Sequence, residues 1–293
     1  DKSAIPYVVE QNGQKMFKVE AITPLIGAEI SGVFLNKDLS SETLEKIYNA
    51  LIKHQVIFFR EQNLTPESHL KLANCLGDID PGHPVYPHVE GFQSITLLKN
   101  DGNSRPDTND WHKDLTFKSK PPFASILHGV SVPEVGGDTL WASMSAAYDS
   151  LTDGWKKDLE GLEAIHDMGT FRNDFYREGG INSVNSALKE VGSATHKVIE
   201  THPISGLKYI NVNQAFTRNI INESQGQSDH RLQFLYQHMA KPEFQVRFHW
   251  KNNSVAIWDN RITQHYAVCD YLPKTRHMQR ITLVNDKREK KSN

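Results

Sequence analysis

Apolar residues recur at helical spacing in several separate stretches of the chain. Within residues 44–51 and again within 232–239, Leu, Ile, Tyr and Met occupy the i, i+3, i+4 and i+7 positions that form one face of a helix. Thr65 followed by Pro66 is typical of a helix N-cap and first helical position, and predicts a helix that ends near Leu76. A fourth helix is predicted from Met144 to Leu162.

Other stretches alternate between apolar and polar residues, as half-buried strands do. Residues 244–250 place Phe, Val, Phe and Trp at alternate positions, with Gln, Arg and His between them. A polar turn at 251–254 follows, and Val255–Trp258 is predicted to return as the hairpin partner. Further short strands are predicted at 94–98, 124–132, 197–201, 209–212 and 279–284.

Many short strands separated by turns are typical of a sandwich or a jelly roll, here with helices packed on its outside. The chain of 293 residues shows no internal repeat and no long Pro/Gly linker. We therefore predict a single mainly β domain over residues 1–293, with a core at about 22–286 and a charged tail at 287–293. The segment from Glu178 to Ser193 is rich in Gly, Ser and Asn, and its composition indicates a loop that could serve as a lid.

Charge and cysteine content exclude some classes of protein. Lys and Arg number 33 and Asp and Glu number 35, which gives a net charge of −2. This balance provides no electrostatic footprint for nucleic acid or for an anionic membrane. No apolar run approaches the length that spans a bilayer. Cys75 and Cys269 are the only cysteines, too few for a disulfide framework, so we expect a cytoplasmic protein.

The sequence Trp111-His112-Lys113-Asp114 contains a candidate metal-binding pair. Residues two apart on an extended segment point to the same side, so His112 and Asp114 can bind one ion, and His265 offers a second imidazole. Two His and one carboxylate on one face of a metal are the ligands of non-haem Fe(II) oxygenases. The same set also suits Zn(II) and Ni(II). A zinc hydrolase and a non-catalytic metabolite-binding jelly roll therefore remain alternatives.

Arg276 follows His265 at a short interval and is suited to bind a second reactant. Its guanidinium can make two parallel, charge-assisted hydrogen bonds to one carboxylate. Arg280 lies on the same face of an alternating strand, so both side chains can point into one cavity. Thr139, after Gly136-Gly137, is on its own simply a strand residue that follows a turn.

The blocks at 111–117, 136–141, 258–265 and 276–280, in this order, resemble the taurine dioxygenase (TauD/TfdA) family from roughly Ile22 to Asp286. The resemblance implies a distorted double-stranded β-helix with flanking helices. It implies that His112, Asp114 and His265 bind Fe(II), with 2-oxoglutarate and O2 as co-substrates. It also implies that Thr139 and Arg276 bind 2-oxoglutarate. The family is commonly dimeric or tetrameric, so we expect a homo-oligomer.

The run from Gly82 to His88 resembles family members that act on taurine. The expected reaction is hydroxylation of the carbon next to the sulfonate of taurine or a related small organosulfonate, which releases sulfite and an aldehyde. The alternative is an alkyl sulfate ester dioxygenase that releases sulfate. Taurine-specific members have Asn where this chain has Thr108, and that Asn helps to hold the amine, so the resemblance is to the acid end of the substrate site. By resemblance, the substrate-binding residues are His83, Tyr86, Thr108, Leu115, Phe117, Phe216 and Arg280.

Overall fold

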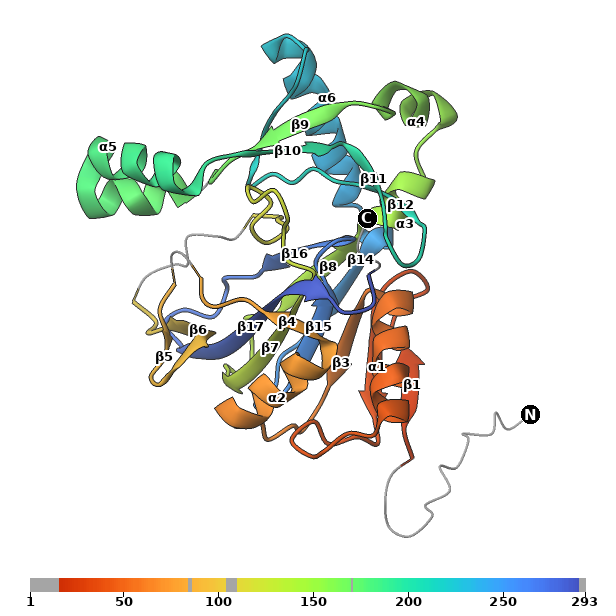
Figure 1. Ribbon diagram of the computed structural model, residues 1–293, viewed down its shortest axis with the longest axis vertical. Coiled ribbons are helices and arrows are strands. Elements are labelled where there is room, and N and C mark those ends of the chain that lie inside the picture. Colours follow the sequence, from red (N-terminus) through yellow and green to blue (C-terminus); the bar gives the residue numbers. More distant parts are fainter. Residues whose placement is uncertain (1–15, 84–85, 104–109, 170, 290–293) are drawn as a thin grey trace.

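A nine-stranded mixed sheet is the largest unit of the computed structural model, which describes residues 16–83, 86–103, 110–169 and 171–289 (Figure 1). Its strand order is β1-β2-β3-β15-β7-β17-β6-β5, and β4 pairs with β17. Only β2 and β3 pair in parallel; the other pairs are antiparallel. The bounds are β1 (Lys18–Ala21), β2 (Ala28–Ser31), β3 (Val56–Phe59), β4 (Gly77–Ile79), β5 (His88–Val89), β6 (Phe92–Asn100), β7 (Ala124–Ser131), β15 (Val255–Asp259) and β17 (Arg276–Asp286).

A second sheet of three strands packs against one face of the large sheet. It consists of β14 (Gln245–Phe248), β8 (Thr139–Ser143) and β16 (Thr263–Ala267), in that order. Aromatic rings fill the space between the sheets: Phe58 stacks on Phe248 at 4.1 Å and meets Trp141 edge-on at 5.3 Å. Trp250 and Trp258 are buried in the same cluster. The mainly β architecture with flanking helices is therefore confirmed.

Two helices cover the opposite face of the large sheet. Helix α1 (Ser41–His54) is capped by Ser40, whose side chain accepts a hydrogen bond from the Thr43 amide. Helix α2 (Pro66–Leu76) begins with the predicted Thr65 cap and first-position proline. Along β3, Ile57 and Phe59 face these helices, whereas Val56 and Phe58 face the second sheet. Burial on both faces explains why this strand is apolar throughout.

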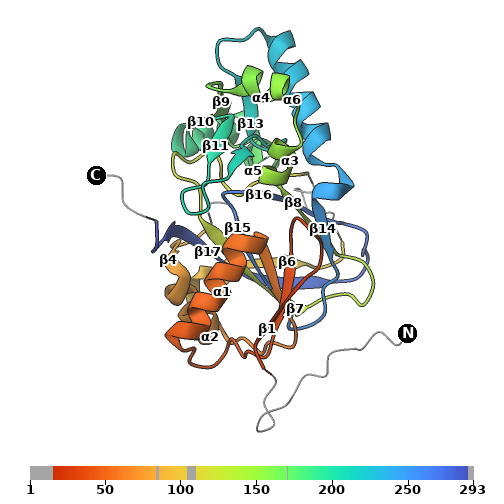
Figure 2. The ribbon, with the colours of Figure 1, turned by 90° about the vertical axis from the view of Figure 1, so that its right-hand side faces the viewer.

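A third group of elements packs beyond the second sheet around its own apolar cluster (Figure 2). Its sheets are β10-β9-β13 and β11-β12. Its elements are α3 (Met144–Asp149), α4 (Asp153–Leu159), β9 (Glu163–His166), α5 (Phe171–Val191), β10 (Ala194–Lys197), β11 (Ile199–Thr201), β12 (Lys208–Ile210), β13 (Thr217–Ile220), α6 (Gln225–Met239) and the 3-10 turn η1 (Pro242–Phe244). Within the described ranges, no helix is both long and apolar enough to cross a membrane.

Several predicted elements need correction. The prediction of a single helix from Met144 to Leu162 is wrong, because this segment forms two helices. The Thr152 side chain accepts a hydrogen bond from the Trp155 amide and thereby starts the second helix, α4. The loop predicted from Glu178 to Ser193 is largely helical and belongs to α5, which is interrupted at Gly179 and Gly180. The predicted strand at 197–201 is divided between β10 and β11.

The predicted hairpin between residues 244–250 and 255–258 is also wrong. Strand β14 pairs with β8, whereas β15 pairs with β3 and β7, so the turn at 251–254 connects the two sheets. The burial predicted from the alternation is confirmed, since Phe244, Val246, Phe248 and Trp250 are all buried. The first residues of the charged tail are packed on α1: the Arg288 guanidinium pairs with Glu45 and lies over the ring of Tyr48.

Candidate active site

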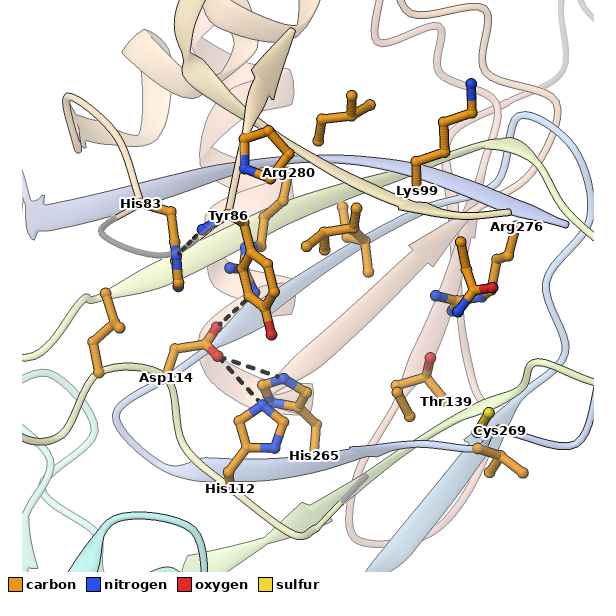
Figure 3. Close-up of a pocket in the computed structure, with 18 of the residues that line it drawn as sticks. His83, Tyr86, Lys99, His112, Asp114, Thr139, His265, Cys269, Arg276 and Arg280 are labelled. Carbon is orange, nitrogen blue, oxygen red and sulfur yellow. Dashed lines mark hydrogen bonds and ion pairs between the residues drawn. The ribbon is translucent and has the colours of Figure 1, made fainter. Parts of the chain in front are cut away.

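The structure brings His112, Asp114 and His265 together at one end of the space between the sheets. One nitrogen from each imidazole and one carboxylate oxygen lie within 4.8 Å of one another. Asp114 Oδ1 is 3.5 Å from His112 Nε2 and 3.7 Å from His265 Nε2 (Figure 3). The backbones of His112 and His265 form a reciprocal bridge, with N···O distances of 3.0 and 2.9 Å. The first ligand segment is thereby joined directly to β16.

Hydrogen bonds orient the side chains of this cluster. His112 Nδ1 donates to the Asp110 carbonyl at 2.8 Å, which leaves the Nε2 lone pair directed at the cluster. The Asn260 side chain accepts from the Asp114 amide at 3.0 Å and donates to the Asp114 carbonyl at 3.1 Å. Asn260 lies in the sequence block 258–265, but its supporting role was not predicted. Only its place beside the ligand segment reveals that role.

The electrostatics favour the ligand forms of Asp114 and His265. Burial alone favours the neutral carboxyl of Asp114. The positive charge of Arg280, together with interactions with the two imidazoles, outweighs burial and holds the pKa of Asp114 below its usual range. Burial, reinforced by His112, lowers the pKa of His265 to about 3. A carboxylate and neutral imidazole are the states that a divalent cation requires, so these residues fit Fe(II).

A cavity of about 340 Å³ extends from this cluster toward Arg276 and Thr139. Arg276 Nη2 donates to the Gly137 carbonyl at 3.3 Å, and its buried Nε has no partner among the described residues. Thr139 Oγ1 accepts from Trp250 Nε1 at 2.9 Å, so its own proton remains available to the cavity. Burial lowers the pKa of Arg276. An incompletely satisfied guanidinium beside a hydroxyl donor fits a carboxylate ligand.

The Gly136-Gly137 turn allows this arrangement of Arg276. Gly137 has φ of +73°, and a Cβ there would lie 3.3 Å from the Tyr271 ring and 3.4 Å from Arg276 Nε. Asp270 Oδ1 accepts a hydrogen bond from the Gly137 amide at 2.8 Å and fixes the turn. The turn therefore packs behind Tyr271 and Arg276, which themselves line the cavity.

The other end of the cavity contains Arg280 and an aromatic wall. Arg280 is 6 % exposed; its Nη1 lies 3.4 Å from Asp114 Oδ2, and its buried Nε has no partner in the described part of the chain. His83 Nδ1 accepts from the Tyr86 amide at 3.1 Å. Burial, together with the charge of Arg280, lowers the pKa of His83 to about 3, so this imidazole is neutral at neutral pH. His83 is thus suited to hydrogen-bond an anion and not to pair with it as a cation.

Most of the predicted site residues line this single cavity. His83, Tyr86, Leu115, Phe216 and Arg280 do so, as do the metal-ligand candidates and Thr139 and Arg276. Phe117 does not line it: this ring packs edge-on at 5.4 Å behind Phe216. Thr108 lies outside the described residues. Lining residues that the sequence prediction missed include Leu97, Leu98, Lys99, Asn100, Phe171, Cys269 and Tyr271.

Comparison with known proteins shows similarity to one family of dioxygenases along most of the chain. The model of the taurine catabolism dioxygenase TauD, TfdA family matches residues 18–282. An alpha-ketoglutarate-dependent sulfate ester dioxygenase of Pseudomonas putida is 38% identical, over 92% of this chain and 89% of that protein. An alkylsulfatase of Acinetobacter baylyi is 36% identical, over 94% of this chain and 87% of that protein. The crystal structure of a taurine dioxygenase from Burkholderia xenovorans superposes with a TM-score of 0.79 at 34% identity, covering 92% of this chain and 90% of that chain.

Proposed function

The chain belongs to the TauD, TfdA family of taurine catabolism dioxygenases, and from this premise we propose that His112, Asp114 and His265 bind its Fe(II). The enzyme is a 2-oxoglutarate-dependent dioxygenase. Membership of this family leaves no support for a zinc hydrolase or a non-catalytic binding protein. We assign the two facing sheets to the distorted double-stranded β-helix expected of the family. The assignment of the metal site rests on the close approach of the three candidate ligand side chains.

Fe(II) and 2-oxoglutarate, when bound, supply O2-dependent hydroxylation of an unactivated C–H bond, with succinate and CO2 as co-products. The residues of the chain position the reactants. Arg276 would hold the distal carboxylate of 2-oxoglutarate through charge-assisted hydrogen bonds, and the Thr139 hydroxyl would donate a further one. The Nε of Arg276, which has no partner in the described part of the protein, supports this role.

We propose that the substrate is a small organosulfonate, with taurine first among the candidates. Arg280 and His83 would hold the sulfonate oxygens, since both line the cavity on the Asp114 side. Leu115, Phe171 and Phe216 exclude water and orient the carbon chain. Hydroxylation of the carbon that bears the sulfonate gives an α-hydroxysulfonate, which expels sulfite and leaves an aldehyde.

An alkyl sulfate ester is the second candidate. The relatives at 38% and 36% identity are named for sulfate esters and alkyl sulfates. The same anion site would accept a sulfate group, and hydroxylation of the adjacent carbon would then release sulfate and an aldehyde. Within the described lining Asp114 is the only acidic residue, and it already faces Arg280, so the ammonium group of taurine has no free carboxylate there.

One experiment separates these substrates. The protein is supplied with Fe(II), 2-oxoglutarate and O2, and succinate, sulfite and sulfate are measured for taurine, longer alkanesulfonates and alkyl sulfates. Sulfite formed in proportion to succinate supports the sulfonate proposal, and sulfate formed from alkyl sulfates supports the alternative. Succinate without either anion, across the whole panel, contradicts both.

A further inference from the structure

Lys113 lies between two of the proposed metal ligands, yet its side chain does not line the cavity. Side chains alternate along an extended segment, so Lys113 points away from His112 and Asp114 into the protein. The residue is only 3 % exposed. Burial of an ammonium group costs free energy unless polar partners compensate for the lost water.

Those partners are neutral and come from separate segments. Lys113 Nζ donates to the Arg261 carbonyl at 2.7 Å and to Asn211 Oδ1 at 2.5 Å. It also lies 5.0 Å from the centre of the Tyr209 ring. Over the described ranges, no carboxylate forms an ion pair with Nζ. The Lys113 amino group is therefore held in place by directional hydrogen bonds to neutral groups.

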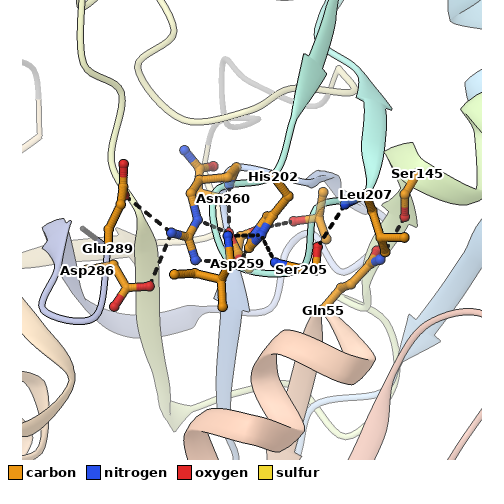
Figure 4. A network of polar contacts seen from close by, with 12 residues as sticks. Gln55, Ser145, His202, Ser205, Leu207, Asp259, Asn260, Asp286 and Glu289 are labelled. Atoms are coloured by element: carbon orange, nitrogen blue, oxygen red, sulfur yellow. Dashed lines mark hydrogen bonds and ion pairs between the residues drawn. The ribbon is translucent and has the colours of Figure 1, made fainter. Parts of the chain in front are cut away.

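The Arg261 carbonyl belongs to the turn between β15 and β16. The guanidinium of the same residue pairs with Asp259 at 2.9 Å and with Asp286 at 3.1 Å, within the polar network around Asp259, Asp286 and Glu289 in Figure 4. Both carboxylates are buried. The turn is thus fixed from its other side, and Lys113 is hydrogen-bonded to an immobilised part of the chain just before the strand that contains His265.

We propose that Lys113 is a positioning residue of the metal site, fixing the segment of His112 and Asp114 relative to the strand of His265. The proposal rests on the metal site proposed above. The backbone bridge and the Asn260 side chain make two further connections between these segments. Lys113 adds a third connection on the opposite side and extends it to Asn211, which follows β12. Hydrogen bonds on both sides preorganise the ligands before an ion binds.

The test is Lys113→Met in the full chain, with Co(II) as the probe and no 2-oxoglutarate present. We expect Co(II) affinity to fall by about 10- to 100-fold, as for other residues that orient metal ligands. The visible absorption of bound Co(II), which reports ligand geometry, should also change. Lys156→Met is the matched control: it removes an ammonium on α4, 5.2 Å from the ring of Tyr148 on α3 and away from the site, and should leave both readouts unchanged.

Asn211→Ala provides an independent variant that retains the lysine. It should weaken Co(II) binding in the same direction, and the double variant should lose less than the sum of the two single losses, because both residues act through one contact. If Lys113→Met does not fold, Asn211→Ala decides the question. If the folded Lys113→Met protein binds Co(II) with wild-type affinity and spectrum, the proposal is overturned, although the metal site itself stands. The same result for Asn211→Ala overturns the proposal if Lys113→Met does not fold. A wild-type protein that binds no Co(II) overturns the metal site and this inference together.

Discussion

Replacement of Arg276 by Met should leave the stability of the ligand-free protein nearly unchanged or raise it, but should weaken co-substrate binding. Among the residues that the structure describes, the guanidinium makes one hydrogen bond, of 3.3 Å to the Gly137 carbonyl, and its buried Nε has no partner. Methionine has a similar length and no charge to desolvate. We therefore expect the free energy of unfolding of the ligand-free protein to stay within about 1 kcal/mol of wild type, or to rise.

Binding of 2-oxoglutarate should suffer severely. Two charge-assisted hydrogen bonds contribute about 1.5–3 kcal/mol each, and their loss corresponds to an affinity roughly 10²- to 10⁴-fold weaker. The assay is anaerobic thermal unfolding with Fe(II), with and without 2-oxoglutarate. Ligand at 100 times its Kd should stabilise the wild type by about 2.7 kcal/mol, whereas the variant should gain almost nothing at the same concentration.

Arg280→Met is the matched control, because it removes the arginine at the other end of the cavity. It should retain most of the stabilisation by 2-oxoglutarate. Equal stabilisation of wild type and Arg276→Met by 2-oxoglutarate would refute the role given to Arg276. A ligand-free Arg276→Met protein destabilised by several kcal/mol would show that the guanidinium has a structural function that its observed contacts do not explain.

Further predictions concern the metal, the substrate, the charge network and pH. His112→Ala should abolish succinate formation, measured with saturating Fe(II) and 2-oxoglutarate. Arg280→Met should raise the KM for the sulfur oxyanion substrate by at least 10-fold, as expected when a charged hydrogen-bonding partner is lost; an unchanged KM contradicts the proposed anchor. Arg261→Met leaves buried carboxylates without their cation and should cost about 3–5 kcal/mol in urea unfolding. Burial lowers the pKa of His69 to about 3. The unfolded chain therefore binds more protons than the native protein between about pH 6.5 and 3, and stability should fall as the pH falls through this window. His69→Leu should flatten that slope, which urea titrations at a series of pH values would measure.

The local sequence signals that proved correct depend on short-range chemistry. The cap at Thr65 with Pro66 and the alternation before Trp250 act within a few residues, and the structure confirms both. The hairpin prediction was wrong because alternation identifies the buried side chains but not the sheet that a strand joins. Val255–Asp259 is buried throughout, since helices cover one face of its sheet and the second sheet covers the other.

The sequence of residues 184–191 also contains a helical pattern, but the loop-like composition around it outweighed this pattern in the prediction. Val184, Ala187, Leu188 and Val191 follow helical spacing, yet the neighbouring Gly, Ser and Asn residues indicated a loop. The structure places these apolar side chains around Phe171 and Phe216. The proposed metal ligands could be predicted because their residue types are distinctive. The support given by Asn260 and Lys113 could not, because it depends on which segments the fold places behind the ligands.

Arg276 and Arg280 come from a single strand, β17, which has neighbours on both edges in the centre of the large sheet. Four residues of strand extend about 13 Å. The backbone of this strand thus sets the distance between the two proposed anion sites, and its hydrogen-bonded register allows little adjustment. A one-residue insertion between them would turn one guanidinium to the far side of the sheet. We therefore expect substitution at position 280 alone to alter substrate preference without moving the proposed co-substrate site, so that the two specificities could evolve separately on one rigid strand.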